Sequence, residues 1–306
     1  MASSQVNSYF ATGIREGLTD TVADLFADDV PFFAMAQKIN IRSTKHEWQD
    51  DNLASPSTTG IVEGASLTYS QPANRTRHAN YTHIRLRNWD VTFTEMAVNV
   101  AGIGDQVARE MMKAMKALLT DYDKIFLNTG NTAVGATGTA RTAKGIQKAI
   151  RTNTGRGSSA GGAVKQALTE SKVNALLQKI WNAGGDPRAL FCGGYQKRVI
   201  SQNFTAKTGF TYQINASSRQ AIANINSYEG SFGTVDIIPD RQHAGARITI
   251  VTPDHLKVAV LRDIQQYKGA PTASSVKGWV EAEMTFQWGN EKAHAKQSHL
   301  KTSTVV

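Results

Sequence analysis

The clearest hydrophobic pattern in the chain runs through residues 105–127. Apolar side chains recur there at steps of three and four residues, and charged side chains lie mostly off that stripe. This spacing places an apolar stripe on one side of an α-helix. Gly102 and Gly104 predict a kink or a new start just before it, and Gly130 is a suitable end. We therefore expect a helix roughly 34 Å long, at about 1.5 Å per residue, that can span a domain.

Alternation of apolar and polar residues, the period of a β-strand, marks several other segments. The longest run covers residues 275–287, where Lys277, Glu281 and Glu283 fall on one face. We expect that face to be polar. The order of helices and strands favours a mixed fold. Shorter strands are predicted at residues 80–94, 189–192, 234–238, 247–251 and 256–261, and further helices at residues 164–183 and 195–200.

Residues 54–79 separate two strand-like segments and are rich in Ser, Thr, Gly and Pro. A stretch of this length without structure of its own is unusual inside a compact domain. It favours an extended two-stranded arm, formed by residues 38–93, that projects from the body. Because a lone hairpin is only marginally stable in water, we expect this arm to rest on another subunit or another element.

Composition narrows the choice of partner and compartment. The 306 residues allow one large domain or two smaller ones, and the net charge of +9 permits a polyanionic partner without requiring one. A single cysteine, Cys192, allows no disulfide within the chain, which suits a reducing cytosol. The N-terminal residues lack the pattern of a signal peptide, and no run of about 18 apolar residues predicts a membrane span.

The sequence contains no convincing catalytic, cofactor-binding or metal-binding motif. The loose dinucleotide pattern Gly155-x-Gly157-x-x-Ala160 follows no clear strand and lacks the expected acidic residue further on. No phosphate-binding P-loop occurs, and the histidines lack the spacing of metal ligands. Cys192 lies in an apolar strand and is expected to be inert. These absences favour a protein that is not an enzyme and uses no cofactor.

A cluster of basic residues around the expected arm allows three interpretations. It could contact nucleic-acid phosphates, with Tyr81 and Trp89 stacking on bases. It could be a solvated strand face. It could also meet acidic residues of a neighbouring copy, such as Asp50, Asp51 or the group at residues 20–29. We favour the last, because a projecting arm must dock to persist. The basic residues are Arg75, Arg77, His78, His83, Arg85 and Arg87.

The order of these elements resembles that of the major capsid proteins of tailed phages, which share the Johnson fold. The most specific likeness is the segment Lys45–Leu53, KHEWQDDNL, which is similar to a motif at the start of the extended loop in one subfamily of phage head proteins. Glu283–Phe286, Asn290–Ala293 and His299–Leu300 are similar to that subfamily's last strand and tail. The likeness covers essentially the whole chain.

The resemblance implies an α+β architecture with four parts. These are an N-terminal arm, an extended β-hairpin loop that overlies a neighbouring subunit, a peripheral domain whose spine is the long helix, and an axial domain whose loops meet around five-fold and six-fold axes. In this chain they would be residues 1–36 for the arm, 37–93 for the hairpin loop, 94–162 and 262–306 for the peripheral domain, and 163–261 for the axial domain.

The function implied by the resemblance is structural. The chain would self-assemble into hexamers and pentamers of an icosahedral head that encloses double-stranded DNA by non-specific contact. Scaffolding, portal and decoration proteins would be further partners, with no membrane involved. The protein would be made in the bacterial host cytoplasm and end in the virion capsid. An encapsulin-like compartment shell and a basic protein that binds single-stranded nucleic acid are the alternatives.

Aromatic side chains dominate many interfaces, so Phe32, Phe33 and Trp48 are the expected anchors between subunits. By the same resemblance, arm and hairpin would rearrange around a nearly rigid body during maturation. The remaining candidate contacts are charged or ionisable residues in and around the hairpin loop: Lys45, His46, Glu47, Asp50, Asp51, Arg75, Arg77, Arg85 and Arg87.

Overall fold

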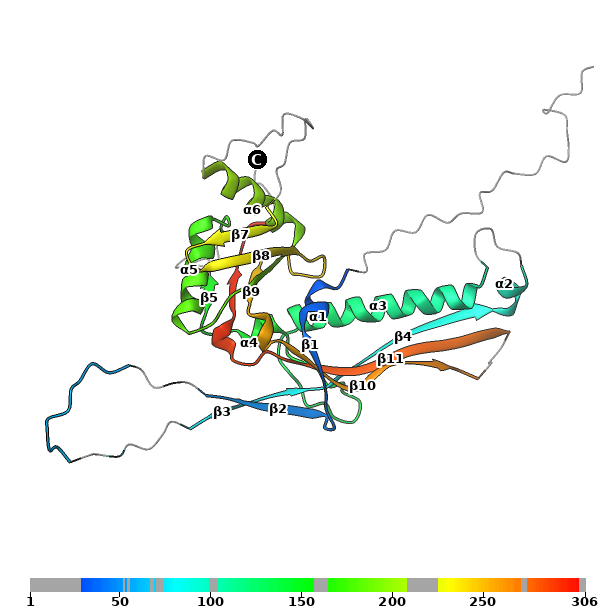
Figure 1. Ribbon diagram of the computed structural model, residues 1–306. Coiled ribbons are helices and arrows are strands. Elements are labelled where there is room, and N and C mark those ends of the chain that lie inside the picture. The colour runs from blue at the N-terminus through cyan, green and yellow to red at the C-terminus, as the bar shows by residue number, and fades with distance from the viewer. Residues whose placement is uncertain are drawn as a thin grey trace, which may run out of the picture.

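The computed structural model shows an elongated molecule with two sheet-containing bodies and a projecting hairpin (Figure 1). One body is built on a four-stranded sheet and the long helix, and the other on a six-stranded sheet with shorter helices. The hairpin is a separate two-stranded sheet. The residues described are 29–51, 53, 56–66, 69, 74–98, 104–156, 165–207, 225–270 and 274–302, with the backbone alone for residues 203–207.

The long helix predicted from the sequence is confirmed as α3, Gln106–Asn128. Asp105 caps it, because its side chain accepts a hydrogen bond from the backbone N–H of Ala108 at 3.1 Å. The helix ends where Thr129 becomes extended. A separate short helix, α2 (Phe93–Ala97), precedes it. The buried side chains of α3 are Ala114, Leu118, Tyr122, Asp123, Phe126 and Leu127.

The four-stranded sheet follows the order β1-β10-β11-β4. β1 is parallel to β10, and the other neighbours are antiparallel. The long strand predicted at residues 275–287 is confirmed as β11, and α3 runs along one face of the sheet (Figure 1). The strands are β1 (Gln37–Asn40), β10 (Lys257–Lys268), β11 (Ser275–Gln287) and β4 (His83–Thr92).

The structure shows which face of β4 is the inner one. Arg85 and Arg87 point toward α3, where both donate hydrogen bonds to the Asp121 carboxylate. Ile84 and Leu86 face the other way and remain 46% and 43% exposed. The cationic face is therefore turned inward, because a carboxylate on the helix supplies its partner. This corrects the interpretation of that face as a solvated one.

The face of β11 that was expected to be polar is also partly covered. Glu283 is 4% exposed. It accepts hydrogen bonds from Thr82 Oγ1 and from Arg141, each at 2.6 Å, and from Arg262 Nε at 3.1 Å. A buried carboxylate is tolerated when it is paired and hydrogen-bonded. Three separate parts of the chain converge here to meet that requirement.

The six-stranded sheet follows the order β5-β12-β9-β6-β8-β7. β12 pairs in parallel with β5 and β6 with β8, while the other neighbours are antiparallel. β5 and β12 come from segments predicted for the peripheral domain, so this sheet does not follow the predicted division at residues 162 and 262. The strands are β5 (Thr154–Arg156), β12 (Ala295–Ser298), β9 (Ile248–Val251), β6 (Ala189–Cys192), β8 (Gly233–Pro239) and β7 (Ser227–Gly230).

Helix α5 (Glu170–Asn182) buries an apolar stripe in the core of the six-stranded body. It begins after Thr169, later than the predicted start at residue 164. Further helices in the described part of the chain are α4 (Ile146–Ala149), α6 (Gly194–Lys207) and the 3₁₀ turns η2 (Pro253–His255) and η3 (Glu291–Ala293).

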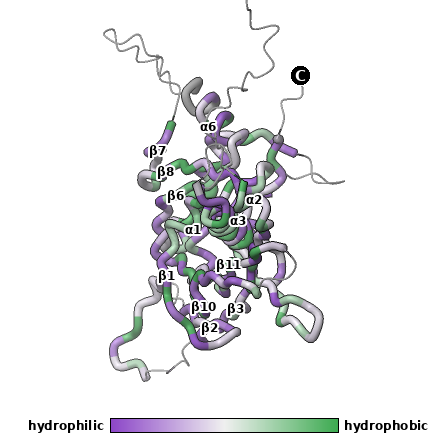
Figure 2. Tube along the Cα trace, turned by 90° about the vertical axis from the view of Figure 1, so that its right-hand side faces the viewer, coloured by the Kyte–Doolittle hydropathy of each residue, from purple (hydrophilic) through white to green (hydrophobic). Residues whose placement is uncertain are grey.

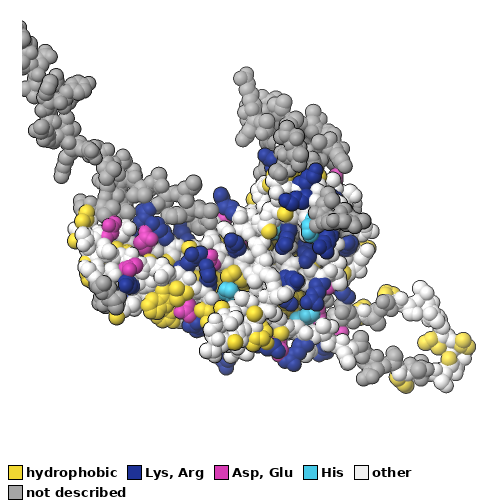
Figure 3. Space-filling model, turned by 180° about the vertical axis from the view of Figure 1, so that it is seen from behind, with side chains coloured by type: hydrophobic (Ala, Val, Ile, Leu, Met, Phe, Trp, Pro, Cys, Tyr) yellow, Lys and Arg dark blue, Asp and Glu magenta, His cyan; other side chains and the backbone are white. Residues whose placement is uncertain are grey.

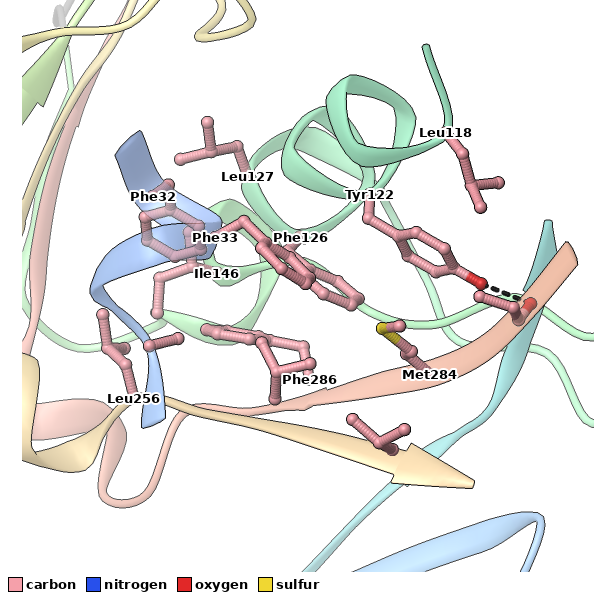
Figure 4. Close-up of a cluster of buried hydrophobic side chains, with 14 of the residues drawn as sticks. Phe32, Phe33, Leu118, Tyr122, Phe126, Leu127, Ile146, Leu256, Met284 and Phe286 are labelled. Atoms are coloured by element: carbon pink, nitrogen blue, oxygen red, sulfur yellow. Dashed lines mark hydrogen bonds between the residues drawn. The ribbon is translucent and has the colours of Figure 1, made fainter. Parts of the chain in front are cut away.

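Both aromatic residues of α1 (Pro31–Met35) enter the core of their own chain (Figure 4). Phe32 is fully buried, with its ring centroid 5.2 Å from that of Phe191. Phe33 stacks on Phe126 at 6.1 Å. Figure 2 shows hydrophobic residues gathered around α1 and α3. The structure thus corrects the assignment of Phe32 and Phe33 to an interface, because neither ring is available to a neighbour.

A pair of buried carboxyl groups joins α1, α3 and the end of β8. Asp123 accepts a hydrogen bond from the backbone N–H of Phe33 at 2.8 Å. Asp240 lies beside it and is 1% exposed. Apart from each other, the Oδ2 atoms of this pair have no hydrogen-bond partner among the described residues. Burial and the neighbouring charge of Asp240 raise the pKa of Asp123 to about 8.

Candidate assembly surface

The predicted arm is present as a hairpin of β2 (Lys45–Asp50) and β3 (Thr76–Tyr81). The strands are antiparallel, with Lys45 opposite Tyr81 and Asp50 opposite Thr76. The hairpin extends away from both bodies (Figure 1). Among the described strands, β2 and β3 pair only with each other, so no further strand extends this sheet.

The root of the hairpin is anchored to the body by Trp48. The indole N–H of Trp48 donates to the backbone carbonyl of Gly289 at 3.0 Å. The indole also meets the Trp288 ring edge-on at 4.6 Å between centroids. His46 Nε2 lies 2.8 Å from Gln287 Oε1. Trp48 is 9% exposed, so the structure places this predicted intersubunit anchor in its own chain.

Asn80 fixes the same root from the other strand and was not singled out from the sequence. It is fully buried. Its side-chain amide donates to the backbone carbonyl of Phe286 at 2.7 Å, and its Oδ1 accepts from the backbone N–H of Lys144 at 2.8 Å. These backbone groups are far from Asn80 along the chain, so the sequence shows Asn80 only as a polar residue in a strand.

The charged residues of the hairpin pair with one another. Glu47 accepts from Arg77, and Lys45 Nζ lies 2.5 Å from the same carboxylate. Arg75 Nε lies 3.4 Å from Asp51. His78 Nε2 lies 2.9 Å from Asp50. Within one chain, these cations therefore have carboxylate partners in their own hairpin, and their contact with acidic residues of a neighbour stays a prediction. The Arg75–Asp51 pair is exposed, and exposed ion pairs contribute little to stability.

Arg85 and Arg87 are held more firmly, by Asp121 of α3. Their nitrogen atoms lie 2.6–2.7 Å from its carboxylate oxygens. Burial alone would raise the pKa of the Asp121 carboxyl, but the hydrogen bonds from Arg87 and Arg85 bring it below its usual value. A polar position on an otherwise apolar helix stripe was the only sequence signal for this acceptor.

The tip of the hairpin exposes apolar side chains to an unusual degree. Leu53 and Tyr69 are 98% and 89% exposed, and Ile61 and Val62 are 74% and 79% exposed. Hydrophobic side chains are visible at the far end of the loop in Figure 3. Next to them, Gly64 adopts a φ of 77° in a turn, a conformation that glycine takes without strain. Apolar side chains on a segment with so little cover mark a surface for contact with another molecule.

A second apolar surface lies on the open face of the four-stranded sheet. Ile84 and Leu86 stand on β4, and Tyr267 stacks on Trp279 across β10 and β11 at 5.5 Å. α3 covers the opposite face of this sheet. Thr82 and Arg141 cover Glu283 on this face, but Ile84 and Leu86 beside it remain partly exposed.

Other kinds of site find little support in the described residues. No group of three or more His, Cys, Asp or Glu side chains among them has the arrangement of a metal site. None of the described helices is long and apolar enough to cross a membrane. Cys192 is buried, and burial raises the pKa of its thiol to about 12, which keeps the nucleophilic thiolate scarce.

Comparison with known proteins decides the family. The family model of the SU10 major capsid protein matches residues 3–301. The chain belongs to this family. It is a structural major capsid protein, as its resemblance to phage head proteins implied. No curated protein matches the sequence of this capsid protein significantly.

Solved structures confirm the Johnson fold of tailed-phage capsids. The capsid asymmetric unit of cyanophage A-1(L) has a TM-score of 0.73 at 13% identity and covers 97% of this chain and 100% of its own. Gordonia phage Cozz gives 0.62 at 14% identity, covering 98% and 99%. The SrpI encapsulin of Synechococcus elongatus PCC 7942 gives 0.61 at 10% identity, covering 94% of each chain. At these identities the likeness establishes the fold.

Proposed function

We propose that this capsid protein assembles into hexamers and pentamers of an icosahedral phage head that encloses double-stranded DNA. The single observation that carries the proposal is the hairpin tip, where Ile61 and Val62 have no apolar cover of their own. A neighbouring copy of the same chain supplies that cover in the assembled shell. Obligate interfaces often bury about 2,000–5,000 Å², and a long hairpin reaches far enough to contribute to such an area.

The two bodies take different places in the proposed shell. The four-stranded body with α3 is the peripheral domain, and the six-stranded body is the axial domain near the five-fold and six-fold axes. The hairpin is the extended loop that overlies a neighbour. The segment before β1 is the N-terminal arm. This division follows the sheets, so β5 and β12 belong to the axial domain.

The charges of the hairpin support a contact that can rearrange. Arg75 and Asp51 are largely exposed, and their pair is held at 3.4 Å. Because exposed ion pairs contribute little, a neighbour's charges can replace a partner at small cost. We therefore keep Lys45, His46, Glu47, Asp50, Asp51, Arg75 and Arg77 as contacts of the assembled shell, while Arg85 and Arg87 remain with Asp121.

The rest of the proposal follows from the role in a virion. The protein is made in the host cytoplasm and ends in the virion capsid, where it acts without catalysis or a cofactor. Scaffolding, portal and decoration proteins are its further partners. Interior contact with DNA is non-specific, which its net charge of +9 favours.

The test compares two double variants of the hairpin tip. Ile61→Ser with Val62→Ser removes the exposed apolar pair, whereas Thr58→Ala with Thr59→Ala changes the same loop without removing it. We expect the first variant to keep the circular dichroism and unfolding curve of the wild type but to form no shells under negative-stain electron microscopy. The second should assemble normally. Normal shells from the first variant would refute the hairpin contact.

The encapsulin neighbour supports a second candidate, a compartment shell that holds proteins. Its TM-score of 0.61 is close to that of the Gordonia phage structure, 0.62. Shells purified from the native source separate the two functions. Double-stranded DNA in the particles supports the phage head, and a single enriched protein cargo with no DNA supports the compartment.

A further inference from the structure

An open hollow of about 470 Å³ lies where the C-terminal end of α3 meets α4, β5 and β12. No described residue that lines it is acidic. It is instead rich in cations and in neutral hydrogen-bonding groups. The cationic side chains are Lys148, Arg156, Arg247 and Lys296, and the neutral residues include Asn128, Thr129, Thr154 and Ser298.

Strand register explains how these residues come together. Lys296 of β12 lies between Thr154 of β5 and Thr249 of β9. Ser298, two residues further along β12, lies beside Arg156. Residues two apart on a strand, and residues directly opposite on neighbouring strands, share one face of a sheet. This face of the six-stranded sheet is therefore built with cations and hydroxyl groups side by side.

The cations of the hollow have no carboxylate partner among the described residues, although Lys296 Nζ donates a hydrogen bond to the backbone carbonyl of Gln147. Within the described part of the chain, none of Lys148, Arg156, Arg247 and Lys296 forms an ion pair. Arg87 and Arg141, by contrast, each pair with a carboxylate. Burial, Arg247 and Lys148 lower the pKa of Lys296, although Glu291 acts in the opposite direction. The positive charges of the hollow therefore repel one another, which makes the protonated form of Lys296 less favourable.

The C-terminal end of α3 does not account for this concentration. A helix terminus carries roughly half a negative charge, which falls well short of several full positive charges. Strain is present as well: His299, which lines the hollow, has a φ of 60° and is the only residue other than glycine with positive φ in the described chain. Strained backbone of this kind often marks a functional site.

We infer that this hollow is a binding site for phosphate groups. Two guanidinium groups and two ammonium groups around a concave surface attract the negative charge of phosphate groups, and Arg can bind phosphate oxygens in a bidentate manner. Hydroxyl and amide side chains such as those of Ser298 and Asn128 are common further donors to phosphate oxygens. Nucleic-acid backbone and free inorganic phosphate share this chemistry.

The site is distinct from the hairpin and does not depend on shell formation. It is formed by α3, α4 and the six-stranded sheet of a single chain. Binding can therefore be measured on unassembled full-length protein. A failure of phosphate binding would leave the assembly proposal untouched, and a failure to assemble would leave the phosphate site untouched.

The test compares two charge-matched double variants. Lys148→Gln with Arg247→Gln removes two exposed cations of the hollow, and Arg42→Gln with Lys268→Gln removes two exposed cations of the four-stranded body. Binding of a short DNA duplex is followed by fluorescence anisotropy over a range of salt concentrations. Inorganic tripolyphosphate is titrated separately by calorimetry, so that the two sources of phosphate are distinguished.

We expect the hollow variant to bind the duplex at least tenfold more weakly, with the slope of log K against log salt smaller by about 1 for each cation that contacts a phosphate. The control variant should bind like the wild type. Tripolyphosphate binding that is lost in the hollow variant, without any duplex binding by the wild type, assigns the site to free phosphate. Arg156→Gln gives an independent check should the double variant fold poorly.

Three results would overturn the inference. The hollow variant could bind both ligands as the wild type does. The control variant could lose as much affinity as the hollow variant, which would make the effect one of general surface charge. Polyglutamate of matched charge could bind as tightly as the duplex with the same dependence on Lys148 and Arg247, which would make the hollow a docking site for an acidic protein.

Discussion

The four-stranded body and the hairpin treat the same residue types in opposite ways. In the body, Phe126 is fully buried and Glu283 is 4% exposed among its partners. In the hairpin, Ile61 and Val62 at the tip stand in solvent, and the half-buried Glu47 of β2 pairs with Arg77, whose side chain is exposed. The body therefore satisfies its own apolar and charged groups. The hairpin leaves both kinds of group accessible, which is the condition for contact with another copy.

The largest effect that should separate the two regions comes from the aromatic core. Phe126→Ala removes a ring that lies 5.5 Å from Phe286 and stacks on Phe33. We expect the free energy of unfolding to fall by about 3–5 kcal/mol, the usual cost of a buried Phe→Ala change. Denaturant unfolding of the unassembled protein measures it. The Ile61→Ser and Val62→Ser changes at the tip should leave that free energy unchanged.

A comparable loss of unfolding free energy in the hairpin-tip variant would contradict this difference between body and hairpin, since it would show that the tip packs into the core of the body. An unchanged free energy of unfolding in Phe126→Ala would also contradict it, since it would show that the buried ring does not stabilise the body. Circular dichroism of both variants before denaturation verifies that each starts from the folded state.

The elements of the body could be predicted because their patterns are strong and local. α3 and β11 follow from apolar spacing alone, within a residue or so of their bounds. The length and composition of the segment between the strands also indicated a projecting hairpin. What the pattern could not settle was the inner face of β4, because Arg85 and Arg87 are turned inward by Asp121, which lies 34–36 residues away along the chain.

Contacts between residues far apart in the sequence also explain why the interface anchors could not be predicted from local pattern. Phe32, Phe33 and Trp48 look like interface anchors when only the sequence is known, since aromatic residues in polar surroundings need apolar partners. Their partners are Phe191, Phe126 and Trp288, all far along the same chain. The pairing of β12 with β5 and β9 is equally invisible to local pattern. Residue type predicted the need for a contact, and only the fold shows which chain meets it.

Loss of a charged group should also affect stability differently in the body and in the hairpin, with an effect of intermediate size. Glu283→Gln leaves the guanidinium groups of Arg141 and Arg262 beside a neutral amide in a largely buried place. Removing one partner of a buried pair costs about 3–5 kcal/mol, and because Arg262 is partly exposed we expect a loss of about 2–3 kcal/mol. The matched change Glu47→Gln, in the hairpin, should not alter the unfolding curve. Equal losses in both variants would show that the hairpin pairs are as deeply embedded as those of the body.

The smallest expected effect concerns pH and the carboxyl pair beneath α1. Because the pKa of Asp123 is raised to about 8, the folded chain holds a proton between about pH 4 and pH 8 that the unfolded chain releases. The free energy of unfolding should therefore fall as pH rises through that window. Asp123→Asn can still accept from the Phe33 N–H and donate to Asp240, but it does not titrate. We expect the wild type to lose about 2 kcal/mol relative to this variant between pH 5.5 and pH 7, since one proton contributes about 1.4 kcal/mol per pH unit.

Denaturant unfolding of both proteins at several pH values measures the difference. Glu47→Gln serves as the hairpin control and should run parallel to the wild type between pH 5.5 and pH 7, because Lys45 and Arg77 lower the pKa of the Glu47 carboxyl and it stays ionised in that window. Parallel curves for the wild type and Asp123→Asn would show that Asp123 and Asp240 do not share a proton. The backbone N–H of Phe33 in α1 donates a hydrogen bond to this same Asp123 carboxyl group. A confirmed difference would therefore mean that the packing of α1 against the four-stranded body weakens as pH rises. The hairpin would be unaffected.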